Sequence, residues 1–79
     1  MSDQTNDVQR ILSAEDEEFR HWVEEHHTCE ARLAELTQKQ DISIEDELEE
    51  KRLKKRKLHL KDLMAARVRG YEDTRAANA

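Results

Sequence analysis

The sequence predicts an all-α fold: an antiparallel, coiled-coil-like hairpin of two helices that self-associates into a four-helix bundle. Three observations lead to this prediction. The 79 residues include no proline and one glycine, whereas β sandwiches and barrels need turn residues about every 8–12 positions. Aromatic residues make up only 4% of the chain, and 42% of it is charged. Apolar residues recur at helical spacing, which indicates amphipathic helices in a single domain.

The first predicted helix covers about residues 13–37 and follows a polar segment, residues 1–12, that is expected to be partly ordered. Ser13 can accept hydrogen bonds from free N–H groups of the first turn, and the acidic residues after it suit the positive helix end. Apolar positions then alternate at spacings of three and four, as in a heptad. They are Phe19, Trp22, His26, Cys29, Leu33 and Leu36. The same pattern extends backwards to Leu12 and Val8, which leaves an earlier helix start open.

The heptad pattern ends at Leu36, because the next positions of the repeat are polar. Ser43 then gives a second helix-start signal, with acidic residues in the turn that follows. A connection of about six residues between two antiparallel helices fits both signals. The alternative is one continuous helix of about 60 residues in a parallel coiled coil, which the broken heptad pattern disfavours.

The second predicted helix covers about residues 44–69 and carries two apolar stripes. The stripe expected to complete the hairpin core contains Leu53, Leu60 and Met64. The stripe on the opposite side contains Ile44, Leu48 and Leu58. Gly70 is expected to end the helix in a left-handed conformation, so that the hairpin domain spans residues 13–70 and residues 71–79 form a flexible tail.

Self-association is predicted because two helices alone leave part of their apolar surface uncovered. A chain of about 70–80 residues or fewer seldom builds a sufficient core without help, and oligomerisation is a common remedy. Ile44, Leu48 and Leu58 are therefore the candidate face for a second copy or for another protein. The simplest assembly is a homodimer of hairpins.

The segment L-K-K-R-K-L-H-L-K-D at residues 53–62 resembles the signature L-K-K-x-x-L-x-L-K-D of the YdcH-like family. These are small bacterial helical-hairpin proteins that belong to a domain of unknown function. Five residues of the first helix fall on the family pattern F-x-x-L-x-x-x-H-x-x-L-x-x-x-I: Phe19, Trp22, His26, Cys29 and Leu33. The sequence departs from the family at Trp22, Cys29 and Leu63. The resemblance covers about residues 10–68 and implies a hairpin with no known enzymatic activity.

Charge is distributed unevenly along the chain. Residues 1–50 contain 16 acidic and four basic residues, whereas residues 51–79 contain ten basic and three acidic ones. One interpretation is that the basic run at 51–61 pairs with acidic residues of the first helix across the hairpin. The expected partners are Lys51 with Glu30, Lys55 with Glu25 and Arg56 with Glu24. The alternative is that the run neutralises phosphates of a nucleic acid, through Lys51, Lys54, Lys55, Lys57 and Lys61.

Histidine and cysteine are present, but their spacing does not predict a metal site. His26 and Cys29 occupy heptad positions of the first helix, while His21 and His27 point elsewhere, so four ligands do not converge. His59 lies across the predicted hairpin from His21. A hairpin of long helices also offers no enclosed site for a nucleophile and its base. We therefore expect no metal, no catalytic residue, no cofactor and no small-molecule substrate.

The function that the sequence predicts best is that of a small, non-enzymatic interaction or accessory module that forms homo-oligomers. The alternative is a nucleic-acid-associated protein that uses the basic run. The chain has no apolar stretch of about 18–20 residues that could span a membrane, and its N-terminus does not resemble a signal peptide. The single cysteine cannot form an internal disulfide, which favours a cytoplasmic location.

Overall fold

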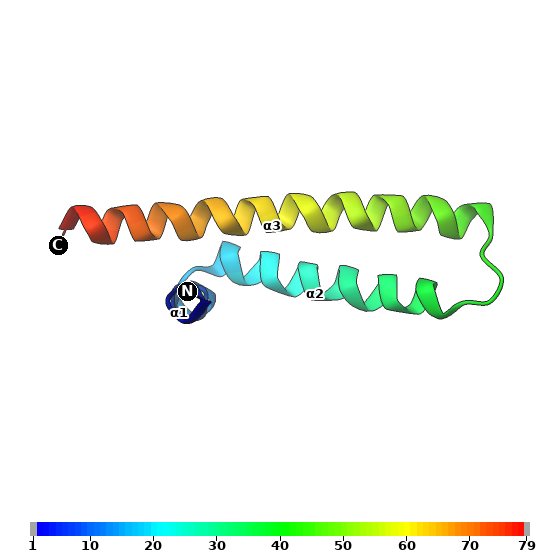
Figure 1. Ribbon diagram of the computed structural model, residues 1–79, viewed down its shortest axis with the longest axis horizontal. Coiled ribbons are helices and arrows are strands. Elements are labelled where there is room, and N and C mark those ends of the chain that lie inside the picture. Colours follow the sequence, from blue (N-terminus) through cyan, green and yellow to red (C-terminus); the bar gives the residue numbers. More distant parts are fainter. Residues whose placement is uncertain (1, 79) are drawn as a thin grey trace.

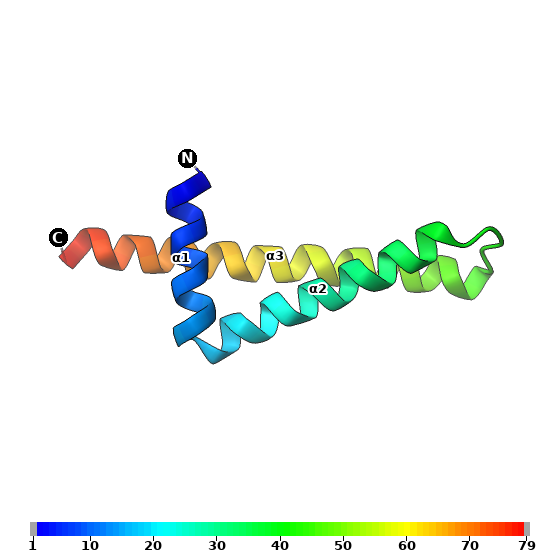
Figure 2. The same cartoon turned by 90° about the horizontal axis from the view of Figure 1, so that it is seen from below.

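A computed structural model describes the backbone of residues 2–78 and the side chains of residues 7–74. This part of the chain forms three helices and no strand: α1 (Ser2–Glu15), α2 (Glu17–Gln38) and α3 (Ile44–Asn78). The predicted all-α class is confirmed. α2 and α3 lie side by side in opposite directions, and α1 joins the start of α2 and crosses α3 (Figures 1 and 2). The molecule is elongated, with extents of 55 × 24 × 17 Å.

The N-terminal fifth of the chain differs from the prediction, because the structure has three helices rather than two. Residues assigned to a polar segment form α1, and α2 begins at Glu17 rather than near Ser13. Asp16 separates the two helices with an extended backbone (φ −112°, ψ 108°), and its side chain accepts a hydrogen bond from Phe19 N at 3.1 Å. Aspartate caps a helix at least as well as serine. The chain turns at Asp16 and folds α1 back over the hairpin.

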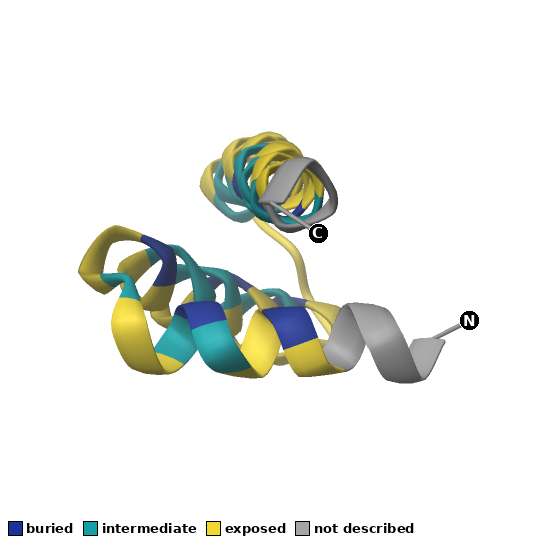
Figure 3. Cartoon of the chain, turned by 90° about the vertical axis from the view of Figure 1, so that its left-hand side faces the viewer, coloured by how far each residue is buried: buried dark blue, intermediate teal, exposed yellow. Residues whose placement is uncertain are grey.

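The core is centred where the three helices meet. Val8 and Leu12 from α1 pack with Phe19 and Val68, and half-buried side chains surround this cluster. Buried positions lie on the sides of the helices that face one another (Figure 3). The sequence placed the core on the two long helices alone, and the contribution of α1 is the main addition. Phe19 is completely buried, and Trp22 meets its ring edge-on with centroids 6.3 Å apart.

All nine residues predicted for the hairpin core are buried or half-buried. The buried ones are Phe19, Cys29, Leu36 and Leu60. The half-buried ones are Trp22, His26, Leu33, Leu53 and Met64. The heptad spacing therefore predicted which side of each long helix faces the other, because residues three and four apart lie on one helical face.

The prediction that the second long helix ends at Gly70 is wrong. This glycine lies within α3 and has no positive φ, so it does not end the helix. Helical backbone continues to Asn78, through most of the segment expected to be a flexible tail. Glycine permits a left-handed stop but does not impose one, and its cost inside a helix is only about 1 kcal/mol. Tyr71 packs against the core just after it, which favours continuation of the helix.

Candidate functional site

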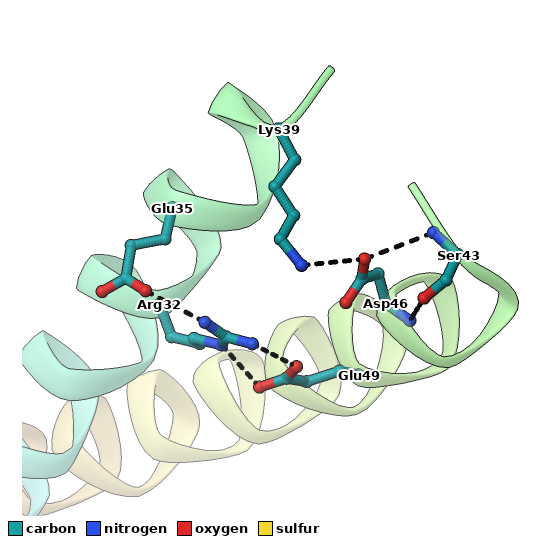
Figure 4. A network of polar contacts seen from close by, with 6 residues as sticks. All are labelled: Arg32, Glu35, Lys39, Ser43, Asp46 and Glu49. Atoms are coloured by element: carbon teal, nitrogen blue, oxygen red, sulfur yellow. Dashed lines mark hydrogen bonds and ion pairs between the residues drawn. The ribbon is translucent and has the colours of Figure 1, made fainter. Parts of the chain in front are cut away.

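The turn between α2 and α3 fixes the position from which α3 starts. Ser43 Oγ accepts a hydrogen bond from Asp46 N at 3.1 Å, and Asp46 Oδ2 accepts one from Ser43 N at 3.2 Å (Figure 4). This reciprocal cap agrees with the start signal read from the sequence. Lys39, at the end of α2, donates to the same carboxylate at 3.0 Å. The hydrogen bonds from Lys39 and Ser43 lower the pKa of Asp46 and favour its charged form.

Arg32 joins the two long helices next to this turn. Its guanidinium donates two hydrogen bonds to Glu49 of α3, at 2.7 and 2.8 Å, and one to Glu35 of α2 at 2.9 Å (Figure 4). These bonds raise the pKa of Arg32, and the hydrogen bonds from Arg32 lower the pKa of Glu49. The first turns of α3 are thus held against α2 by polar contacts.

The opposite side of α3 carries three large apolar side chains that are exposed. Ile44 is 76% exposed, Leu48 48% and Leu58 61%. A helix turns by about 100° per residue, so these positions lie about 120–180° around the helix from Leu53 and Leu60, which face α2. We call this surface the outer face of α3. It consists of Ile44, Leu48, Lys51, Lys55 and Leu58, spaced alternately by four and three residues.

A shallow groove of about 540 Å³ runs along part of the outer face. Its ends are Leu48 and Leu58, and four cationic side chains line it between them: Lys51, Arg52, Lys54 and Lys55. The sequence had singled out the three apolar residues and the lysines as separate candidates. The structure places Leu48, Leu58, Lys51 and Lys55 together on one helical face.

Part of the basic run is paired with α2. Arg56 donates to Glu25 at 2.5 and 2.9 Å, and Lys57 lies 3.3 Å from Glu30. The predicted pairing across the helices is present, but its partners differ: Arg56 was expected opposite Glu24. A displacement of one residue along α2 changes which acidic side chain faces α3, and spacing alone does not fix it. The hydrogen bonds from Arg56 and Lys57 lower the pKa values of Glu25 and Glu30.

The rest of the basic run makes no ion pair with any described side chain of α2. Lys54 pairs only with Glu50 of its own helix, at 3.3 Å. Lys51, Arg52, Lys55 and Lys61 are exposed and make no ion pair with any side chain that the structure describes. The predicted pairs of Lys51 with Glu30 and of Lys55 with Glu25 are therefore absent. The five candidate lysines for nucleic acid divide into two in ion pairs and three without one.

At the other end of the hairpin, Arg67 of α3 connects to the junction of α1 and α2. It donates to Asp16 and, at 2.6 Å, to Glu18, and its guanidinium lies 4.8 Å from the centre of the Trp22 ring. The pKa of Asp16 is lowered, first by the hydrogen bond from Phe19 N and then by Arg67. The sequence gave no direct signal for this contact, because it joins residues 51 positions apart.

His26 is half-buried where the three helices form a groove of about 840 Å³. Its Nδ1 lies 3.4 Å from Glu30, and its Nε2 is buried without a hydrogen-bond partner among the described atoms. Cys29 is buried with a free thiol, while His21, His27 and His59 are exposed. The described residues contain no group of three or more histidine, cysteine or carboxylate side chains that could hold a metal ion. Within the same part of the chain, no helix combines the length and apolarity needed to cross a membrane.

Comparison with known protein families gives a match to this chain. A family model described as "Protein of unknown function (DUF465)" matches residues 19–68, which is more than half of the chain. The matched region includes most of α2, the turn and the first two thirds of α3, and with them the whole outer face. No curated protein and no solved structure matches significantly.

Proposed function

The chain belongs to the DUF465 family, the same family as the YdcH-like proteins that the sequence resembles, and we propose from its geometry that it is a self-associating protein–protein interaction module without enzymatic activity. The proposal assigns the contact to the outer face of α3. The two long helices serve as the support that presents this face. This function requires binding alone and no catalytic residue.

One observation carries the proposal: Ile44, Leu48 and Leu58 are exposed on a single face of one helix. Scattered exposed apolar residues are ordinary, but several large ones on one face of a helix are typical of an interaction surface. Burial of apolar area is worth about 25 cal/mol per Å², so covering three large aliphatic side chains favours association. An amphipathic helix of a partner can cover such a stripe with residues at the same spacing.

The experiment measures the mass of the protein in solution over a range of concentrations by sedimentation equilibrium. We expect a dimer that dissociates on dilution. Replacing Ile44, Leu48 and Leu58 together with serine is expected to give a monomer whose helical circular dichroism is unchanged. The matched control replaces Ala31 and Ala34 with serine, because both are exposed on α2 away from the outer face. A wild-type chain that stays monomeric at high concentration would refute self-association.

A second candidate function is nucleic-acid binding, and the cations without ion pairs favour it. Lys51, Lys55 and Lys61 are free to contact phosphates, whereas Lys54 and Lys57 are engaged within the chain. Fluorescence anisotropy with labelled single-stranded and duplex DNA and RNA tests this function. Binding should weaken steeply as salt rises, and replacing the three free lysines with glutamine should reduce it further. Replacing Lys54 and Lys57 is the matched control. Absence of binding at low salt excludes this candidate.

A further inference from the structure

We infer that two copies of the chain dock through the outer face of α3 in antiparallel orientation, around a two-fold axis that passes beside Lys51. This inference rests on the proposed self-association and adds its geometry. The interface is isologous, because the same face contributes from both copies. The dimer contains six helices, with the two α3 helices at the centre and each α2 on the outside.

The outer face is accessible to a second α3 because it points away from α2. The α2-facing side of α3 contains Leu53 and Leu60, and Leu60 is completely buried there. The outer-face residues lie about 120–180° around the helix from these positions. Their alternating spacing of four and three residues is the one by which side chains of two helices interdigitate along a common line. A straight helix can therefore approach along the turns from Ile44 to Lys55, while Leu58 also borders the groove between α1, α2 and α3.

The charges of α3 favour the antiparallel orientation. Its first turns carry acidic side chains next to the outer face, including Glu45 and Glu47. The following turns carry Lys51, Arg52 and Lys55, which make no ion pair with any described side chain. A parallel dimer would place acidic turns beside acidic turns and basic beside basic. An antiparallel dimer places the acidic turns of one copy against the basic turns of the other, which is favourable and selects the orientation.

The positions of the apolar residues select the register. With the axis beside Lys51, Ile44 of each copy lies opposite Leu58 of the other, because both are seven residues from position 51. Leu48 then packs on the aliphatic stem of Lys55 in the second copy, while the charged end of that lysine stays in water. The two-fold axis repeats this contact, so the exposed apolar residues at both ends of the face are covered in each copy.

Two features of this register concern charge. Glu47 of one copy lies opposite Lys55 of the other, which supplies an opposite charge for a cation that makes no ion pair with a described side chain of its own chain. The two Lys51 side chains approach each other at the axis, and their ammonium groups must extend sideways into water. An axis beside Leu48 would avoid this contact, but it would leave Leu58 opposite the turn of the second copy and uncovered.

Disulfide cross-linking tests the arrangement. In a Cys29→Ala background, Lys51→Cys should oxidise to a covalent dimer, because the two copies meet at this position. Ile44→Cys and Leu58→Cys should remain monomeric when oxidised alone and should cross-link when mixed. In the proposed register, residue 44 of one copy and residue 44 of the other are about 21 Å apart along the helix axis of α3. This distance is far beyond the reach of a disulfide. All three positions are exposed or on the helix surface, so circular dichroism should show unchanged helicity.

Two cross-linking patterns overturn the inference. Cross-linking of Leu48→Cys in preference to Lys51→Cys means an axis beside Leu48. Cross-linking of Ile44→Cys with itself means a parallel dimer. Sedimentation of the reduced, wild-type protein separates this failure from failure of the proposed function. A monomer in this measurement refutes self-association itself. A dimer that shows one of the two contrary cross-linking patterns refutes only the proposed orientation or register.

Discussion

Arg56 of α3 and Glu25 of α2 are joined by two hydrogen bonds, 2.5 and 2.9 Å long, between side chains 31 residues apart in the sequence. The planar guanidinium meets both carboxylate oxygens, which is the arrangement that arginine forms better than lysine. The pair sets the register of the two long helices near the middle of the hairpin. It also removes one cation from the basic run and leaves its neighbours on the outer face free.

Loss of this pair should have a small but measurable effect. Replacing Arg56 with glutamine is expected to lower the melting temperature by less than about 5 °C, because exposed ion pairs contribute little. The difference between variant and wild type should shrink at high salt, which screens the charges. Thermal unfolding followed by circular dichroism measures both values. Arg69→Gln is the control, since Arg69 makes no ion pair with a described side chain; an equal loss there would mean that Arg56 acts only through general charge.

Truncation of the core should be far more damaging. Leu60 is completely buried, and Leu60→Ala is expected to lower the free energy of unfolding by about 2–5 kcal/mol through lost burial and the cavity left behind. Urea unfolding gives this value. Ile42→Ala is the matched control, because Ile42 lies in the turn and is 47% exposed, so its truncation should cost about 0.5 kcal/mol or less. Similar losses at both positions would contradict the described packing.

A substitution at Gly70 should stabilise the protein rather than destabilise it. It lies in the interior of α3, and an added Cβ would meet nothing within 4 Å. Gly70→Ala is therefore expected to raise the free energy of unfolding by about 0.5–1 kcal/mol, because alanine has the higher helix propensity. If Gly70 were a left-handed stop, the same substitution would destabilise the protein. Chemical unfolding distinguishes the two signs.

The protein should lose stability in acid. The pKa values of Asp16, Glu25, Glu30, Asp46 and Glu49 are all lowered in the folded chain. A carboxyl group whose folded pKa lies below its unfolded value binds fewer protons when folded. Its contribution is complete above the unfolded pKa of about 4 and is lost as the pH falls through the folded pKa. The melting temperature should therefore fall as the pH decreases below about 4.

Asp16→Asn isolates one part of this acid sensitivity. Asparagine retains the helix cap but removes the charge that faces Arg67. The variant should be less stable than wild type at neutral pH and should lose less stability on acidification. Melting temperatures of both proteins across the acid range measure the difference. Parallel pH profiles would show that the charge of Asp16 does not contribute.

Features that depend on neighbouring residues were predicted from the sequence, whereas features that depend on long-range packing were not. The core faces of α2 and α3 and the cap at Ser43 follow from residues a few positions apart, and all are present in the structure. The start of α2 was predicted near Ser13, but the cap is Asp16, because either residue suits the role and only the packing of α1 distinguishes them. The contact of Arg67 with Asp16 depends on that packing and has no local signal.

The sequence by itself determined that this chain is helical, which residues of the two long helices face the core, and where the second of them begins. These properties depend on helix propensity, capping and the three-and-four spacing of apolar residues, all of which act within one or two turns. Only the tertiary structure decided that residues 2–15 fold back over the hairpin, which residue caps α2, and which cations are paired. A displacement of one residue between two helices, or a turn at one position between α1 and α2, changes the neighbours of every side chain without changing any local pattern. The cations and leucines of the outer face are therefore exposed together because α2 packs against the other side of α3.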